Sequence, residues 1–388
     1  MKNKLFSTLN KTLVQSQKYN FAQSIKIPLV PLINSVDIET KNIPTETTTT
    51  PEELLKYYKT LSLWRRTEVE ADNLYKQKEI RGFCHLYNGQ EAIALGIDEG
   101  STHKDLLITA YREHCQAMSR GFTPYEIIAE MMSRATGGTK GKGGSMHYYR
   151  KETNFYGGHG IVGAQIPMGT GLAYSLKHKK NNENFCITMF GDGSSNQGQF
   201  YESTNLAGLH KLPIAYVCEN NRYGMGTSVN RASHHTQLFS KFRSIPGINI
   251  NGQCIFTVRE WTKWAKNFVI KNGPLIVELD TYRYYGHSMS DPGISYRNRD
   301  EVNDFRNSKD CILLIKKLIL QNNVATEKDL KDIDNEIRDK LEADIAKIFK
   351  DPLPEEKELF TELYIHQEKM FIRNILVEDS YHLNLLEN

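Results

Sequence analysis

Two short apolar segments, each ending in oxygen-bearing side chains, constrain this chain most. The run 185–190 ends in Gly191-Asp192-Gly193, and the run 214–218 ends in Glu219-Asn220-Asn221. A helical pattern over about 199–211 separates them. Strand, helix and strand in this order predict a parallel unit with both polar ends at one edge of an open sheet, where ligands bind in such folds.

The residue types at this edge suit a divalent cation. Asp192 offers a carboxylate, Asn221 an amide oxygen and Tyr223 a backbone carbonyl, which is a set that Mg²⁺ accepts when a diphosphate supplies further oxygens. Gly193 and Ser194 would present backbone N–H groups to phosphate at a helix amino terminus. The alternative is that Asp192 only forms a turn with its own backbone amides. The paired asparagines that follow the second strand favour the metal site.

The remaining pattern alternates strands with helices. Strands are expected over 105–111 and 274–281, and helices over 125–133 and 257–271. This alternation predicts an α/β fold with a doubly wound, mostly parallel sheet flanked by helices. The glycine-rich segment 137–171 is expected to be a long loop that enters a helix near Pro167.

A phosphate-binding P-loop is an alternative interpretation of the glycine-rich run Lys140–Ser145. The spacing does not fit, because Thr136 stands where the first glycine would be and Gly143 stands where a serine or threonine would follow the lysine. A nucleoside triphosphate site is therefore not expected here.

The amino-terminal part differs in composition from the rest. Residues 1–36 hold five lysines and no acid, which predicts a mitochondrial transit peptide, with a disordered tail as the alternative. Residues 37–50 end in a threonine run and are expected to be a linker. Residues 51–388 then form one domain, which begins with a helix at Pro51 capped by Thr50 and has a helical carboxyl-terminal part capped by Thr326.

Charge and cysteines exclude several classes of protein. The net charge is +3, and the lysines before residue 37 account for it, so nucleic-acid binding has no support. The six cysteines form no Cys-x-x-Cys pair, which argues against a disulfide frame or a zinc site. No segment approaches the ~20 apolar residues of a membrane-spanning helix.

Two histidines and one arginine are further candidates. His85 and His287 lie among glycines, aromatic residues and hydroxyls, which suggests a cleft, although each is by default a satisfied core or surface residue. Arg112 follows a strand and can clamp an anion with its planar guanidinium. A surface ion pair with Glu113 or Asp105 is the alternative for Arg112.

Longer strings carry a family resemblance that covers residues 50 to 350. The strings are Arg81-Gly-Phe-Cys-His-Leu86, Ile108-Thr-Ala-Tyr-Arg112, Lys140-Gly-Lys-Gly-Gly-Ser-Met-His147, Gly160-Ile-Val-Gly-Ala-Gln165, Glu219-Asn-Asn-Arg-Tyr-Gly-Met-Gly-Thr-Ser-Val229 and Tyr282-Arg-Tyr-Tyr-Gly-His-Ser-Met-Ser-Asp-Pro-Gly293. They resemble the alpha subunits of the mitochondrial pyruvate dehydrogenase decarboxylating component, within the thiamin-diphosphate-dependent 2-oxo acid dehydrogenases. The resemblance implies oxidative decarboxylation of pyruvate with transfer of the acetyl group to a lipoyl group, producing acetyl-CoA in the full complex.

The resemblance also implies roles for individual residues. His85 and His287 are the implied catalytic residues, and the implied ligands of Mg²⁺ are Asp192, Asn221 and the carbonyl of Tyr223. The implied contacts with thiamin diphosphate come from His85, Tyr111, Arg112, Gly160, Val162, Asp192, Gly193, Ser194, Asn221, Tyr223 and His287.

Partners and location follow from the same resemblance. It implies an α2β2 heterotetramer with a beta subunit that supplies the carboxylate activating the aminopyrimidine, a lipoyl acetyltransferase core, and the mitochondrial matrix. Ser228, Ser288 and Ser295 match regulatory phosphorylation sites for a kinase and phosphatase. A branched-chain 2-oxo acid dehydrogenase alpha subunit and an inactive alpha-like structural subunit are the alternatives.

The sequence departs from the family pattern at three places. Tyr285 stands where many relatives have histidine, and Ser194-Ser195 replaces two small apolar residues. Residues 151–153 look like a short insertion, so no cofactor contact is carried over there.

Overall fold

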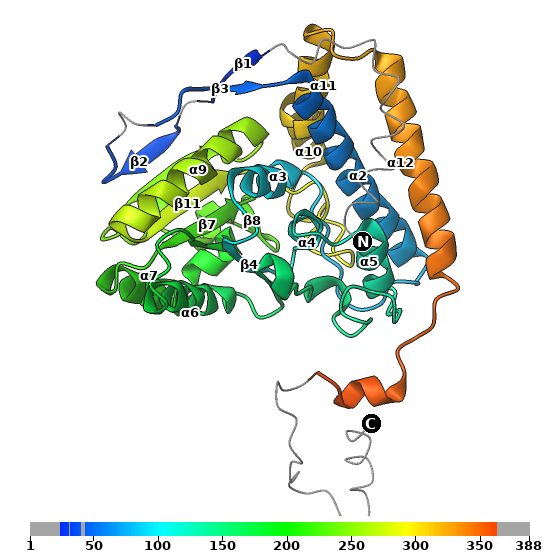
Figure 1. Ribbon diagram of the computed structural model, residues 1–388, viewed down its shortest axis with the longest axis horizontal. Helices are drawn as coiled ribbons and strands as arrows, with labels where there is room; N and C mark the ends of the chain where they lie inside the picture. Colours follow the sequence, from blue (N-terminus) through cyan, green and yellow to red (C-terminus); the bar gives the residue numbers. More distant parts are fainter. Residues whose placement is uncertain (1–23, 31, 40–42, 363–388) are drawn as a thin grey trace, which may run out of the picture.

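A seven-stranded sheet is the centre of this computed structural model, which describes residues 24–30, 32–39 and 43–362 (Figure 1). Its strand order is β2-β10-β11-β7-β6-β4-β5, and all neighbours are parallel except β2, which runs antiparallel to β10. The predicted α/β fold is confirmed. The strands are β2 (Asn34–Val36), β4 (Leu106–Ala110), β5 (Phe155–His159), β6 (Cys186–Gly191), β7 (Ile214–Asn220), β10 (Gly247–Asn251) and β11 (Leu275–Asp280).

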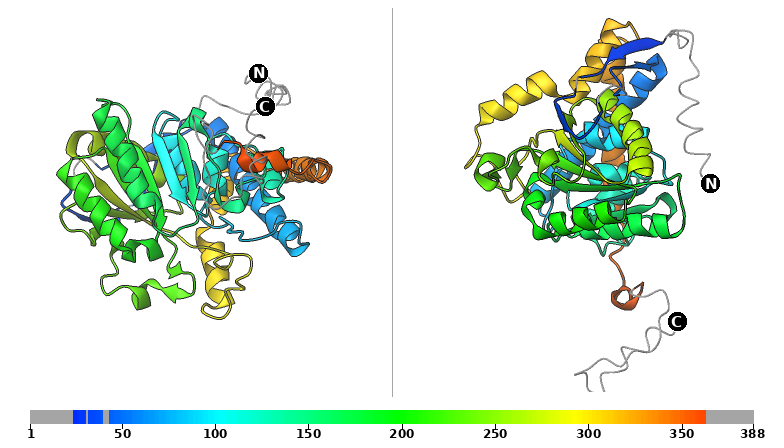
Figure 2. Two further views of the ribbon diagram at one scale, coloured as in Figure 1. Left: turned by 90° about the horizontal axis from the view of Figure 1, so that it is seen from below. Right: turned by 90° about the vertical axis from the view of Figure 1, so that its left-hand side faces the viewer.

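Helices cover both faces of the sheet because its central strands are apolar on both sides. In β6, Cys186 and Phe190 face one core, whereas Ile187 and Met189 face the other. Helices α6 (Gln165–His178) and α7 (Gly198–Leu209) cover the first face and lie side by side in Figure 2. On the opposite face, α9 (Ile255–Asn272) packs on the strands and α3 (Glu91–Gly100) packs on α9.

Outside the sheet, two long helices pack along each other (Figure 1). Helix α2 (Pro51–Lys76) begins after Thr50, whose hydroxyl accepts from the Glu53 amide, and α12 (Glu327–Ile348) begins with a capping box of Thr326 and Asp329. Both predicted starts are confirmed. No helix in the described ranges is long and apolar enough to cross a membrane. The other helices are α4 (His114–Ser119), α5 (Pro124–Met131), α8 (Val229–Ala232), α10 (Arg299–Lys309) and α11 (Cys311–Gln321), with 3₁₀ turns η2 (Gly144–Met146), η3 (Lys151–Thr153), η4 (Asp192–Asn196), η5 (Leu238–Ser240) and η6 (Glu356–Phe360).

The segment 24–49 differs from its prediction. Strand β1 (Ile25–Pro28) pairs with β3 (Glu46–Thr49), and β2 joins the main sheet. Ile25, Ile27 and Leu29 are buried, and this alternation is that of a half-buried strand. Strands therefore lie within the expected leader over 1–36 and within the expected linker over 37–50. Residues 1–23 lie outside the described part.

The glycine-rich segment is organised around a buried carboxylate. Glu130 is fully buried, and its two oxygens accept hydrogen bonds from the amides of Thr139, Gly141, Gly143 and Gly144 at 2.6–3.2 Å. Successive backbone N–H groups that point inward form an anion-binding concavity, and here the anion is the protein's own. The segment is also not one long loop, because it contains β5, whose two glycines conceal the strand pattern.

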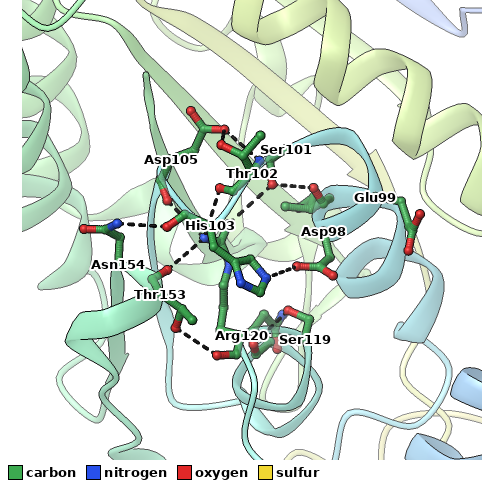
Figure 3. A network of polar contacts seen from close by, with 12 residues as sticks. Asp98, Glu99, Ser101, Thr102, His103, Asp105, Ser119, Arg120, Thr153 and Asn154 are labelled. Carbon is green, nitrogen blue, oxygen red and sulfur yellow. Dashed lines mark hydrogen bonds and ion pairs between the residues drawn. The ribbon is translucent and has the colours of Figure 1, made fainter. Parts of the chain in front are cut away.

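The predicted insertion lies at the opposite end of the sheet from the candidate site. Arg120 is fully buried and donates to the carbonyls of Asp105 and Thr153, which precede β4 and β5 (Figure 3). The Thr153 hydroxyl donates in return to the Arg120 carbonyl. The residues of η3 therefore help to hold the amino ends of two strands together.

Candidate active site

The candidate residues come together at the carboxyl edge of the sheet, as predicted. Tyr111 and Arg112 follow β4, Gly160 and Val162 follow β5, and Asp192, Gly193 and Ser194 follow β6. Asn221 and Tyr223 follow β7, and His287 belongs to the segment after β11. Each strand delivers its residues to the same edge because these five strands are parallel.

Asp192 and Asn221 are both buried at this edge, and their surroundings suit a cation. Burial raises the pKa of Asp192 to about 6, an effect that nearby Arg283 opposes. Arg283 itself donates from Nη1 to Asn221 Oδ1 at 3.4 Å and to the Tyr223 carbonyl at 3.0 Å. The Asp192 carboxylate also accepts a hydrogen bond from the Asn221 backbone amide, so carboxylate and amide oxygens, which Mg²⁺ accepts as ligands, lie close together.

The two candidate histidines lie against each other. The ring centroids of His85 and His287 are 5.2 Å apart, and Tyr111 lies 4.4 Å from His85 and 5.6 Å from His287. Burial, with Arg112 nearby, lowers the pKa of His85 to about 2 and that of His287 to about 4. Both imidazoles are therefore neutral near pH 7, each with one N–H donor and one acceptor.

Arg112 is buried and makes no ion pair with any side chain in the described ranges. Its Nη1 donates to the Leu86 carbonyl at 2.7 Å, and its Nη2 donates to the His287 carbonyl at 2.8 Å. The alternative partners lie elsewhere, since Glu113 accepts from the Tyr148 amide and Asp105 pairs with Lys266. The guanidinium joins the two segments that carry His85 and His287.

The candidate phosphate contacts differ slightly from the prediction. Gly193 and Ser194 lie in the short turn η4, and α7 begins only at Gly198. Gly193 also approaches the neighbouring loop, because a Cβ on Gly224 would lie 3.2 Å from Gly193 Cα. Gly160 is exposed, an added Cβ there would lie 3.6–3.8 Å from the Met146 and His147 side chains, and Val162 is 41% exposed. These two residues are free to contact a further molecule.

The three candidate phosphorylation serines differ in exposure. Ser295 is exposed, Ser228 is partly buried, and Ser288 is buried with its hydroxyl 2.9 Å from that of Ser290. Ser228 ends the hairpin of β8 (Tyr223–Gly224) and β9 (Thr227–Ser228). Arg283 connects this hairpin to the segment that carries the other two serines, because its Nη2 donates to the Met225 carbonyl and the Tyr296 hydroxyl.

Sequence reasoning missed two side chains that contact the candidate metal ligands. Arg283 lies within a string quoted for the family resemblance, but it was given no role. Gln90 precedes α3 and accepts a hydrogen bond from the Asn221 amide at 3.0 Å. No local pattern marks a glutamine in a turn as a neighbour of a residue 131 positions away.

Comparisons with known proteins agree with this arrangement. The family described as Dehydrogenase E1 component matches residues 59–357. The chain is 49% identical to the pyruvate dehydrogenase E1 component subunit alpha, mitochondrial, of Pisum sativum over 82% of this chain and 80% of the relative. It is 48% identical to the Dictyostelium discoideum protein of the same name over 83% of this chain and 85% of the relative. The somatic-form subunit of Bos taurus is also 48% identical, over 85% of this chain and 84% of the relative. This chain belongs to the dehydrogenase E1 component family.

Proposed function

We propose that this chain is the alpha subunit of the decarboxylating component of a mitochondrial pyruvate dehydrogenase complex. The observation that carries the proposal is the meeting of Asp192, Asn221 and the Tyr223 carbonyl at one sheet edge, in a chain about half identical to curated alpha subunits over most of its length. The relatives are named for pyruvate, so the branched-chain alternative is not favoured. Because Asp192, Asn221 and the Tyr223 carbonyl are all present, an inactive structural subunit is not favoured either.

The edge residues bind Mg²⁺ and thiamin diphosphate. Asp192, Asn221 and the Tyr223 carbonyl would hold the metal, while Tyr111, Arg112, Gly193 and Ser194 would contact the diphosphate. Gly160 and Val162 would contact the aminopyrimidine. When bound, thiamin diphosphate supplies the carbanion-stabilising chemistry that decarboxylation of pyruvate requires.

His85 and His287 act at the reacting centre as neutral groups. Their lowered pKa values leave each with an N–H that can stabilise a developing alkoxide and a nitrogen that can accept a proton. Arg112 fixes the backbone beside both histidines, so their relative placement is set before substrate arrives. The acetyl group is then transferred to a lipoyl group of the acetyltransferase core.

A beta subunit completes the site and covers an apolar surface. Helices α6 and α7 expose large hydrophobic side chains, and an added Cβ on Gly171 or Gly198 would meet nothing within 4 Å. Exposed apolar patches with room for close backbone approach suit a large, permanent subunit interface. The partner also brings the carboxylate that activates the aminopyrimidine. The exposed side chains are Met168, Tyr174, Tyr201, Leu206 and Leu209.

Targeting and regulation are also part of the proposal. The mature chain works in the mitochondrial matrix, and because Ile25 and Ile27 are buried, a leader is removed before residue 25. A kinase and phosphatase act on Ser228, Ser288 and Ser295. A phosphate of about −2 charge next to His287 would repel the cofactor's diphosphate or open the segment.

One assay tests the function. The chain is co-expressed with a candidate beta subunit, and CO₂ release from pyruvate is compared with release from 3-methyl-2-oxobutanoate, with and without Mg²⁺ and thiamin diphosphate. We expect release from pyruvate that depends on both additions and is absent with the isolated chain. Preference for the branched substrate, or no release from the assembled tetramer, would reject the proposal.

A further inference from the structure

We infer that Gln90 is a positioning residue that fixes which atom of the Asn221 amide faces the metal. This inference rests on the proposed metal site. Asn221 ligates a cation only through Oδ1, because its Nδ2 carries two hydrogens and has no lone pair to give. A buried amide beside a cation therefore needs a neighbour that holds it in one of its two orientations.

Gln90 supplies that neighbour through a chain of buried hydrogen bonds. Asn221 Nδ2 donates to Gln90 Oε1 at 3.0 Å, and Gln90 Nε2 donates to Glu219 Oε1 at 3.3 Å. Gln90 is 1%, Glu219 5% and Asn221 7% exposed, so water does not readily replace these bonds.

The groups at both ends of this chain of hydrogen bonds favour the same orientation of the Gln90 and Asn221 amides. At one end, Glu219 Oε1 accepts from both the Tyr87 hydroxyl and Gln90 Nε2, which leaves Gln90 Oε1 facing Asn221. At the other end, Arg283 has only N–H donors, so the Asn221 atom at 3.4 Å from its Nη1 must be the oxygen.

The backbone before Gln90 places its side chain within reach of Asn221 and Glu219. Gly89 has a φ of 98°, and a Cβ there would lie 2.5 Å from the Tyr282 carbonyl oxygen, so only glycine fits the turn. Gln90 is the amino-terminal cap of α3 but makes no side-chain capping bond, which leaves its amide available for Asn221.

The test measures metal binding directly on the assembled enzyme. Metal-free tetramer with saturating thiamin diphosphate is titrated with Mg²⁺ in a calorimeter. We expect Gln90→Met to raise the half-saturating Mg²⁺ about 10–100-fold, the usual effect of losing a partner of a metal ligand. If the Gln90→Met tetramer does not assemble, Gln90→Leu is titrated in its place.

Gln165→Met is the matched control. Gln165 is a buried glutamine at the start of α6, and its Nε2 donates to the Met189 carbonyl at 3.1 Å without touching Gly89 or Asn221. It should lower thermal stability as Gln90→Met does and leave Mg²⁺ binding unchanged.

A second arm separates orientation from general damage. In an Asn221→Asp background, residue 221 presents an oxygen in either orientation, so Gln90→Met should change the half-saturating Mg²⁺ by no more than about 2-fold. Equal Mg²⁺ affinities of Gln90→Met and Gln165→Met, with Asn221→Ala still weakened, would overturn the positioning role alone. Unchanged binding in Asn221→Ala would overturn the metal site and, with it, this inference.

Discussion

Arg112 Nη2 donates to the backbone carbonyl of His287 at 2.8 Å, although 175 residues separate the two in the chain. Its Nη1 donates to the Leu86 carbonyl, next to His85. One buried cation therefore holds together the two segments that carry the candidate catalytic rings.

Replacing Arg112 by lysine tests this connection. Lysine keeps the charge but cannot donate along two directions of a planar fork. We expect weaker retention of thiamin diphosphate and a loss of about 1.5–3 kcal/mol for each charge-assisted bond that is not remade. Calorimetric titration and urea unfolding measure the two effects. Arg338→Lys, an exposed change on α12, is the control and should alter neither.

Asp192→Asn should separate ligand binding from stability. Because burial raises the pKa of Asp192 to about 6, its charge is unfavourable at pH 7 without a metal. The metal-free variant should be at least as stable as the wild type. It should lose the stabilisation that ligand gives, which is about 2.7 kcal/mol at 100 times Kd. Thermal unfolding with and without Mg²⁺ and thiamin diphosphate measures both effects. If the two ligands raise the melting temperature of Asp192→Asn as much as that of the wild type, Asp192 has no role in metal binding.

Glu130→Gln should loosen the glycine-rich segment. The variant keeps one acceptor oxygen but turns an NH₂ group toward backbone N–H donors that Glu130 now satisfies. A cost of about 1–3 kcal/mol is expected for each polar group left unpaired. Limited proteolysis should then cut within 139–147 more rapidly. Glu152→Gln, an exposed change in η3, should leave the cleavage pattern unchanged.

Truncation tests the amino-terminal boundary. A chain that begins at residue 24 should assemble with full thermal stability. A chain that begins at residue 37 loses β1 and β2, and with them the burial of Ile25, Ile27 and Leu29, each worth at most about 1.5–3 kcal/mol. Equal melting temperatures for the two chains would restore the boundary first predicted from composition.

The two histidines predict how stability depends on pH. Their folded pKa values of about 2 and 4 lie below the ordinary value of 6.5, so below pH 6.5 the unfolded chain binds more protons. Stability is therefore full above pH 6.5 and falls as the pH drops toward 4. In urea unfolding, His287→Asn should lose less stability than the wild type between pH 7 and 5. An identical loss in the two proteins would show that His287 titrates normally.

The sequence predicted the α/β fold and the meeting of the candidate residues at one sheet edge, but it missed individual strands. Asp192 and Asn221 follow strands whose apolar runs are local, so their meeting at one edge could be deduced. Strand β5 was not predicted because Gly157 and Gly158 conceal its alternation. Strand β1 was not predicted because it is short and its one lysine, Lys26, belongs to the basic composition typical of a leader. The role of Glu130 could not be deduced, because its partners are backbone amides that leave no mark in the sequence.

The internal carboxylate at Glu130 has a consequence for selectivity. A backbone curled to receive anions would otherwise attract ATP or inorganic phosphate, both abundant in a mitochondrion. Since Glu130 is covalently attached, no soluble competitor can match its local concentration. Phosphorylated metabolites are thereby excluded from this segment.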